Sequence, residues 1–451
     1  MVASILLIAG VLLLGTLTST VTASLVWNTT TNPQALCNDF TKAGYFITRN
    51  RTNSDKWLIF LESGGLCFSN DTCNRRYFNR KIRERFARPQ GEAREFPPYG
   101  NFDPEEAWNA TSGAGEHLNT IINPLMSSME CFVNRPEFPR GLQVDGKDIL
   151  DTDCGVNPHF CNYNHVLLPY CSSDIWLGDE TDNARNPPRT RRGACDCFDQ
   201  NCFRFQPQTD NLQFTFRGKV IFESVIQDLF QMGMRDATEV IVAGSSAGGL
   251  GALNLAKWTR EQLPTSVELL IFFDSSWFIN FQGNILREFN GTVNQMESEA
   301  GSTGVLLTLL ESHPACANTE LGYPCCLSAH CVLTERGPNS TLLYYPEHVK
   351  TFGVFGLYDV FLLAGSLRGL PTVQDQRTPV GFALDYLRTV GEYGGAMNQT
   401  LAAASSRTPD FSYYVTECFQ HIYLATSTLW GAGGLFGTSS VEVGRQIASF
   451  R

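Results

Sequence analysis

The sequence predicts an α/β fold with a mainly parallel central sheet, helices on both faces and disulfide-stapled insertions. Over the second half of the chain, short apolar runs rich in β-branched residues alternate with helical patterns, which is typical of parallel strands joined by helices. Of the 451 residues, 43% are apolar and 18% are charged, which suits one large domain carrying insertions. The chain also contains 15 cysteines, enough for several disulfides.

The individual elements are predicted from the same patterns. Apolar runs predict strands at residues 56–62, 165–170, 240–243, 267–273, 352–357 and 411–415. Apolar residues at helical spacing predict helices at residues 220–232, 250–256 and about 376–396. Residues 25–55 are polar and are expected to form loops, stapled by Cys37. We expect one domain over residues 24–451, with lid-like insertions at about 74–160 and 281–345.

The N-terminus and the cysteines indicate export. Residues 5–17 are almost wholly apolar and precede a small-residue site after Ala23, which predicts a signal peptide at residues 1–23. An uncleaved membrane anchor is the alternative; no other stretch is long enough to span a membrane. Fifteen cysteines indicate an oxidising compartment, so we expect a secreted protein. Seven sequons suit a glycoprotein surface, at Asn28, Asn50, Asn70, Asn109, Asn290, Asn339 and Asn398.

Charge and cysteine spacing exclude several classes of partner. The net charge of −11, with no long basic run, argues against nucleic acid and against an anionic membrane surface. Only Cys195-Asp196-Cys197 and Cys325-Cys326 are tightly spaced, and neither pattern suits a tetrahedral zinc site. We therefore expect no metal.

The segment Gly244-Ser245-Ser246-Ala247-Gly248 lies between the strand at 240–243 and the helix at 250–256. It fits the G-x-S-x-G nucleophile elbow, in which a serine occupies a strained turn between a strand and a helix. The pattern places Ser246 at the tip of the turn. A Gly/Ser-rich turn that only packs a helix onto a sheet is the competing interpretation.

An acyl-transfer serine also needs backbone amides that bind the oxyanion. The amide of Ala247, directly after the serine, is the first candidate. The strand at 56–62 ends in Ser63-Gly64-Gly65, and an early strand ending in glycines is where further oxyanion-hole amides are expected. Ser172 and Asp174 follow the strand at 165–170 and are interpreted as residues that shape a cleft rather than as catalysts.

A serine nucleophile needs a base, and the base needs an orienting acid; after a G-x-S-x-G elbow the chain order is serine, acid, histidine. Four histidines follow Ser246: His313, His330, His348 and His421. His421 comes last, in a loop after the final core segment, where the base belongs. Asp274 and Asp359 both end strands after the elbow, and Asp359 is preferred because the acid typically follows a later strand.

Four segments together resemble the pectin acetylesterase/Notum family: residues 60–68, 168–176, 243–249 and 418–421. The Pro-Tyr-Cys-Ser-Ser-Asp stretch at 169–174 is more similar to the Notum branch, the palmitoleoyl-protein carboxylesterases, than to the plant enzymes. The resemblance implies a secreted serine carboxylesterase with an α/β-hydrolase fold and no cofactor. It also implies Ser246, Asp359 and His421 as the triad, and Gly64, Gly65 and Ala247 as the oxyanion hole.

The sequence departs from the family pattern beside the oxyanion hole. The Notum branch carries a Trp-Tyr pair where this chain has Gly65 and Leu66, while Trp277 and Phe278 fit the family's pocket wall. The leading hypothesis is removal of a fatty acyl (palmitoleoyl) group from a serine of a Wnt-type signalling protein. The alternative substrate is an O-acylated polysaccharide of the pectin type, deacetylated in an open groove. A catalytically inactive binding module on the same scaffold is the third interpretation.

Overall fold

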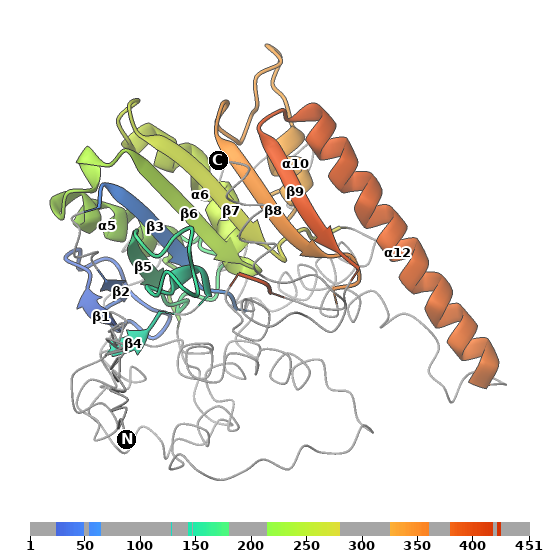
Figure 1. Ribbon diagram of the computed structural model, residues 1–451, viewed down its shortest axis with the longest axis horizontal. Helices are drawn as coiled ribbons and strands as arrows, with labels where there is room; N and C mark the ends of the chain where they lie inside the picture. The colour runs from blue at the N-terminus through green and yellow to red at the C-terminus, as the bar shows by residue number, and fades with distance from the viewer. Residues whose placement is uncertain are drawn as a thin grey trace, which may run out of the picture.

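The protein is described here from a computed structural model, which covers residues 24–48, 54–64, 128, 143–146, 148–179, 214–279, 325–359, 379–417 and 422–424. The predicted signal peptide, residues 1–23, lies outside these ranges. Within them the chain forms a nine-stranded sheet in the order β4-β1-β2-β5-β3-β6-β7-β8-β9, shown in Figure 1. The strands are β1 (Ser24–Thr29), β2 (Gly44–Thr48), β3 (Lys56–Leu61), β4 (Gln143–Asp145), β5 (Asn164–Leu168), β6 (Glu239–Ser245), β7 (Glu268–Asp274), β8 (Lys350–Gly356) and β9 (Phe411–Thr416).

Six neighbouring strands are parallel, and this confirms the predicted mainly parallel sheet. β5, β3, β6, β7, β8 and β9 run in one direction, whereas β2, β1 and β4 form an antiparallel extension at the β5 edge. All seven residues of β6 are buried, as expected of a central strand covered on both faces. Each predicted strand is present to within a few residues.

The prediction of loops throughout residues 25–55 is wrong, because β1 and β2 lie there. β1 is a mostly half-exposed strand in which only Leu25 is buried, and its apolar run Leu25-Val26-Trp27 is only three residues long. β2 is fully buried but only five residues long. It pairs with β1 on one side and β5 on the other, and these long-range pairings do not show in the local sequence.

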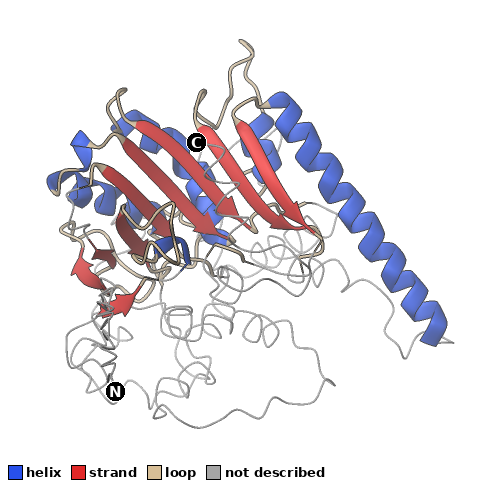
Figure 2. Cartoon of the chain, viewed as in Figure 1, coloured by secondary structure: helices blue, strands red, loops and turns tan. Residues whose placement is uncertain are grey.

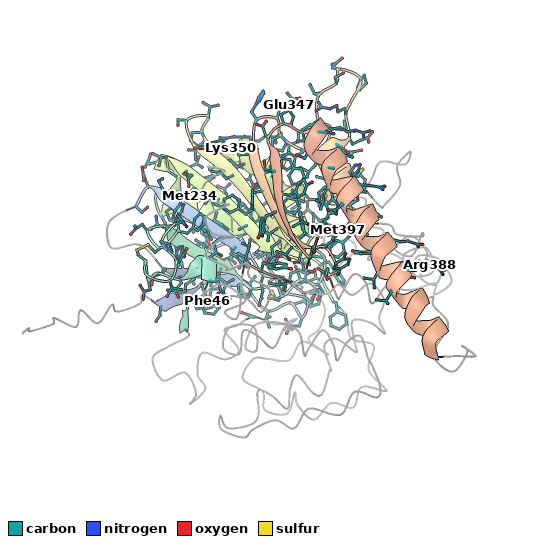
Figure 3. The ribbon with its side chains drawn as sticks, turned by 45° about the vertical axis from the view of Figure 1, so that its right-hand side comes forward. Phe46, Met234, Glu347, Lys350, Arg388 and Met397 are labelled. Carbon is teal, nitrogen blue, oxygen red and sulfur yellow. A yellow bond between two sulfur atoms is a disulfide. The ribbon has the colours of Figure 1, made fainter. Side chains whose placement is uncertain are left out.

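The described α-helices pack on one face of the sheet. They are α5 (Gly218–Gln231), α6 (Ala247–Gln262), α10 (Ala329–Thr334) and α12 (Pro379–Arg407). In Figure 2 the blue helices α5, α6 and α10 lie behind the red sheet, and the long helix α12 runs beside its β9 edge. Residues of all four helices share one hydrophobic cluster with alternate residues of the strands. Met397, labelled in Figure 3, belongs to this cluster and is 1% exposed.

The opposite face of the sheet is covered, in the described residues, by the short 3-10 helix η3 (Asp148–Leu150) and by loop segments. Ile149, Leu150 and Phe160 pack there with Tyr423 and Leu424 against the second set of strand side chains. β4 and η3 come from the end of the segment predicted as the first insertion, and β4 pairs with β1 at the sheet edge.

Three disulfides join described cysteines. Cys37–Cys171 spans 134 residues and links the β1–β2 connection to the end of β5, which confirms Cys37 as a staple. Cys154–Cys161 and Cys325–Cys331 close short local loops. The second pair lies next to α10, in the part of the second predicted insertion that the structure describes, so that part is disulfide-stapled as expected.

Candidate active site

Ser246 occupies a sharp turn between β6 and α6. Its backbone angles, φ 52° and ψ −118°, are sparsely populated for a residue with a side chain and cost about 1–3 kcal/mol, so the surrounding structure has to enforce them. Two glycines allow the turn to close. A β-carbon on Gly244 would lie 2.3 Å from the carbonyl oxygen of Gly248, so strand and helix meet where side chains cannot fit. This is the strand–turn–helix context that the G-x-S-x-G pattern predicts.

The elbow is hydrogen-bonded to the end of the neighbouring strand, β7. The amide of Ser246 donates a 2.7 Å hydrogen bond to the carbonyl oxygen of Asp274. The hydroxyl of Ser276 donates to the carbonyl oxygen of Ser246 at 2.8 Å. The main-chain N–H and C=O of Ser246 are therefore both held by the last residue of β7 and the residues directly after it.

The first turn of α6 lies against the end of β3. Ala247 is the first residue of α6, and the amides of a helix's first turn have no acceptor within the helix. A β-carbon on Gly248 would lie 2.1 Å from the carbonyl oxygen of Leu61 and 2.7 Å from that of Glu62. Gly64, two residues beyond Glu62, is buried at this edge. The structure thus brings Ala247 and the β3 end together, while Gly65 lies outside the described residues.

The end of β3 is held by residues that sequence reasoning did not assign to the site. The indole of Trp176 donates to the carbonyl oxygen of Glu62 at 3.2 Å, and the amide of Tyr170 donates to the Glu62 carboxylate at 2.9 Å. Trp176 also packs against α6, since a β-carbon on Gly251 would lie 2.7 Å from its Cβ. The only sign of this role in the sequence was that these residues lie in segments that resemble the family, 60–68 and 168–176.

Ser172 and Asp174, interpreted from the sequence as cleft-shaping residues, are almost fully buried. The carboxylate of Asp174 accepts hydrogen bonds from the Ser172 hydroxyl and from the amides of Trp176, Gly178 and Gly218. Burial raises the pKa of Asp174 to about 6, and these donors oppose the shift. The contacts hold the β5 loop to the start of α5.

Asp359 lies three residues after β8 and is 1% exposed. Its amide donates to the carbonyl oxygen of Gly356 at 3.2 Å, which forms a tight turn at the strand's end. α12 packs directly on this turn: a β-carbon on Gly394 would lie 2.7 Å from the ring of Tyr358. Burial raises the pKa of Tyr393 well above its ordinary value, and the charge of Asp359 raises it further. Asp359 is thus a buried acid at the same sheet edge as the elbow.

Asp274, the competing acid, ends β7 and is fully buried. Its carboxylate accepts hydrogen bonds from the hydroxyls of Ser245 and Ser275 and from the amides of Tyr423 and Leu424. Burial raises the pKa of Asp274 and the four donors oppose that shift.

His421 lies outside the described residues, and its place in the triad stays a prediction. The described chain reaches Glu417, just past the end of β9, and resumes at Ile422. Ile422 donates from its amide to the Ser275 hydroxyl at 2.8 Å, one residue beyond Asp274. The residue directly after His421 is therefore fixed next to the elbow.

The predicted pocket residues differ in exposure. Trp277 is 1% exposed, stacks on Phe411 with an interplanar angle of 3° and donates from its indole to the Thr400 hydroxyl at 3.0 Å. It is part of the core between the strands and α12. Phe278 is partly buried against the same cluster, and Leu66 lies outside the described residues. The pocket role of these three side chains stays a prediction.

Within the described ranges, no group of three or more His, Cys, Asp or Glu side chains could hold a metal ion.

Comparisons with known proteins agree with the fold. The chain is 20% identical to Drosophila Notum, a Wnt deacylase of known structure, with a TM-score of 0.57 over 94% of this chain and 92% of that one. This likeness supports the predicted α/β-hydrolase fold. The chain is 31% identical to the palmitoleoyl-protein carboxylesterase notum2 of Xenopus laevis over 253 residues, and 26% identical to human NOTUM over 253 residues. These matches span 55% of this chain but only 36% and 35% of the two relatives.

The pectinacetylesterase family model matches residues 16–88 and 140–303, more than half of the chain. The matched part includes the end of β3, the elbow with Ser246 and the β7 end with Asp274, whereas Asp359 and His421 follow it. The resemblance inferred from the sequence is therefore confirmed: the chain belongs to the pectinacetylesterase family.

Proposed function

We propose that the protein is a secreted serine carboxylesterase that hydrolyses its substrate through an acyl-enzyme. The observation that carries the proposal is the geometry of Ser246, a buried serine in a strained strand–helix turn with the first-turn amides of α6 beside it. Family membership and the Notum relatives, which are named as carboxylesterases, support the same reaction class.

In the proposed mechanism His421 removes the proton of Ser246 as its hydroxyl attacks the ester carbonyl. Asp359 orients the imidazole and stabilises the imidazolium that forms. The amides of Ala247, Gly64 and Gly65 bind the developing oxyanion. His421 then protonates the leaving alcohol. In the second half of the reaction His421 takes a proton from water as the water attacks the acyl-enzyme carbonyl, and it returns that proton to the Ser246 oxygen as the acid is released. The reaction needs no cofactor.

The proposed substrate is a fatty acyl ester, a palmitoleoyl group on a serine of a Wnt-type signalling protein. The support is the set of relatives whose names specify this activity. The family description supports a second candidate, an O-acetylated polysaccharide. Secretion is proposed because three disulfides join described cysteines, which suits an oxidising compartment. No described helix is long and apolar enough to span a membrane.

The test is hydrolysis of p-nitrophenyl esters from acetate to palmitate by the purified protein and by Ser246→Ala. We expect a rate that peaks at octanoate or longer and is lost in the variant, together with release of palmitoleate from an acylated serine peptide. A peak at acetate, with release of acetate from acetylated pectin, would replace the lipid substrate by the polysaccharide. Equal rates for both proteins would overturn the esterase proposal in favour of a binding module.

A further inference from the structure

Asp274 joins the elbow to the segment that follows His421. It is the last residue of β7 and lies beside Ser245 in the parallel pairing of β6 with β7. Its Oδ2 accepts the Ser245 hydroxyl at 2.9 Å, and its main-chain oxygen accepts the Ser246 amide at 2.7 Å. One residue therefore binds both the nucleophile's main chain and the side chain next to it.

The same carboxylate holds the segment that directly follows His421 in the chain. Oδ2 accepts the amides of Tyr423 and Leu424 at 2.7 and 2.8 Å. The Ser275 hydroxyl donates to Oδ1 at 2.8 Å and accepts the Ile422 amide at 2.8 Å. Three consecutive amides, starting with the residue after His421, thus end on Asp274 or on its neighbour. In Figure 1 the short red segment of residues 422–424 lies near the tips of β6 and β7.

The backbone of Ile422 has a conformation that is unfavourable for this residue type. Ile422 has φ 73°, a left-handed conformation that a β-branched residue adopts only when neighbouring contacts enforce it. The bond from the Ile422 amide to the Ser275 hydroxyl and the bonds from the next two amides to Asp274 are the contacts that hold it in this conformation.

The carboxylate of Asp274 accepts four hydrogen bonds. Oδ2 accepts three donors and Oδ1 a fourth, and every one of them is a hydroxyl or an amide of the elbow strand, the β7 end or the segment 422–424. With this pattern Asp274 acts on main-chain geometry, and the role of orienting acid remains with Asp359.

We propose that Asp274 is a positioning residue that holds the main chain of Ser246 and the segment 422–424, which directly follows the predicted base His421, in one fixed arrangement. The inference rests on the proposed esterase function. A displacement of about 1 Å between reacting groups costs on the order of 100-fold in rate, so the effect falls on kcat.

The test is Asp274→Asn, which keeps the shape and one acceptor oxygen but places an NH2 group against donors. With p-nitrophenyl butyrate we expect kcat to fall roughly 10- to 100-fold while KM changes less than about 3-fold. We also expect the acid limb of the kcat/KM pH profile to move to lower pH, because loss of a nearby negative charge lowers the pKa of the base. Hydrogen exchange should be faster at the amides of Tyr423 and Leu424.

The matched control is Asp228→Asn. Asp228 is also buried, at 5% exposed, and its carboxylate accepts the amide of Thr31 at 3.1 Å and the Thr31 hydroxyl, but neither donor belongs to the elbow or to residues 422–424. This variant should lose stability and keep kcat. If Asp274→Asn does not fold, Ser245→Ala and Ser275→Ala replace it as test variants. Each removes one hydroxyl hydrogen bond to Asp274 and should lower kcat several-fold.

The outcomes separate this inference from the esterase proposal. The positioning role is overturned if the wild type is active and the folded Asp274, Ser245 and Ser275 variants all have a kcat within about 2-fold of the wild-type value. The esterase proposal then stands. A kcat loss equal to that of Asp228→Asn also overturns the positioning role. A wild type without Ser246-dependent hydrolysis overturns both.

Discussion

A β-carbon on Gly248 would lie 2.1 Å from the carbonyl oxygen of Leu61, so the first turn of α6 touches the end of β3. The two peptide segments proposed to form the oxyanion hole are therefore held together by a contact that tolerates no side chain. Neither backbone can yield cheaply, because β3 is paired on both sides and α6 begins at the strained Ser246.

Gly248→Ala is expected to lower the free energy of unfolding by roughly 1–3 kcal/mol through overpacking and to reduce kcat at least about 100-fold. Gly395→Ala is the matched control, because a β-carbon there meets nothing within 4 Å in the middle of α12. It should stabilise the protein by about 0.5–1 kcal/mol and leave kcat unchanged. Denaturant unfolding and ester hydrolysis measure both; equal effects of the two substitutions would contradict the close contact.

Asp359→Asn tests the assignment of the acid. An asparagine keeps the size of the side chain but no longer stabilises the imidazolium, so kcat should fall on the order of 10⁴-fold. The loss should exceed that of Asp274→Asn, whose main effect is to displace the reacting groups. The measurement is kcat for a short-chain p-nitrophenyl ester. A larger loss of kcat in Asp274→Asn would identify Asp274, not Asp359, as the acid that orients the base.

His165 gives the fold a defined acid sensitivity. It is fully buried on β5 and its Nε2 donates to the carbonyl oxygen of Phe160 at 2.8 Å. Burial lowers its pKa from 6.5 to about 4. Between these values the unfolded chain binds a proton that the folded chain does not, so stability falls as pH falls through this window, by up to about 3 kcal/mol.

His165→Gln should flatten this part of the stability curve between pH 6.5 and 4, measured by urea unfolding at several pH values. The control is His348→Gln, because the His348 side chain is 91% exposed. An unchanged slope in His165→Gln would show that other groups carry the acid sensitivity.

The Cys37–Cys171 disulfide should contribute more stability than the local ones. It closes a loop of 134 residues, whereas Cys154–Cys161 closes one of 7. Chain entropy predicts contributions of about 5 and about 2 kcal/mol. Replacing both cysteines of each pair by alanine and comparing denaturant unfolding tests this ranking. A smaller loss for Cys37–Cys171 would contradict it.

The sequence predicted the elbow and the central strands because their signals are local. A continuous apolar run such as 240–243 can only be a buried segment, and the glycines around Ser246 mark the turn directly. α12 was expected to end near residue 396 but continues to Arg407. Leu401 and Ala404 of this extension pack into the hydrophobic core with strand residues. The local sequence could not predict this packing.

The role of Asp274 could not be predicted from the sequence. Its partners Ser245 and Leu424 are 29 and 150 residues away in the chain, so only the folded sheet brings them together. The same holds for Trp176, whose partner Glu62 is 114 residues away. Local patterns identify groups that react; the groups that hold them depend on tertiary pairing.

The most direct test of the account is covalent labelling with an alkyl fluorophosphonate, followed by intact mass measurement and peptide mapping. The account predicts one adduct per chain, on Ser246, that is absent from heat-denatured protein and from Ser246→Ala. Loss of this label in Asp359→Asn would agree with activation of the serine by the triad. An unlabelled native protein, or an adduct on Ser245 instead, would contradict the claim that Ser246 is the nucleophile.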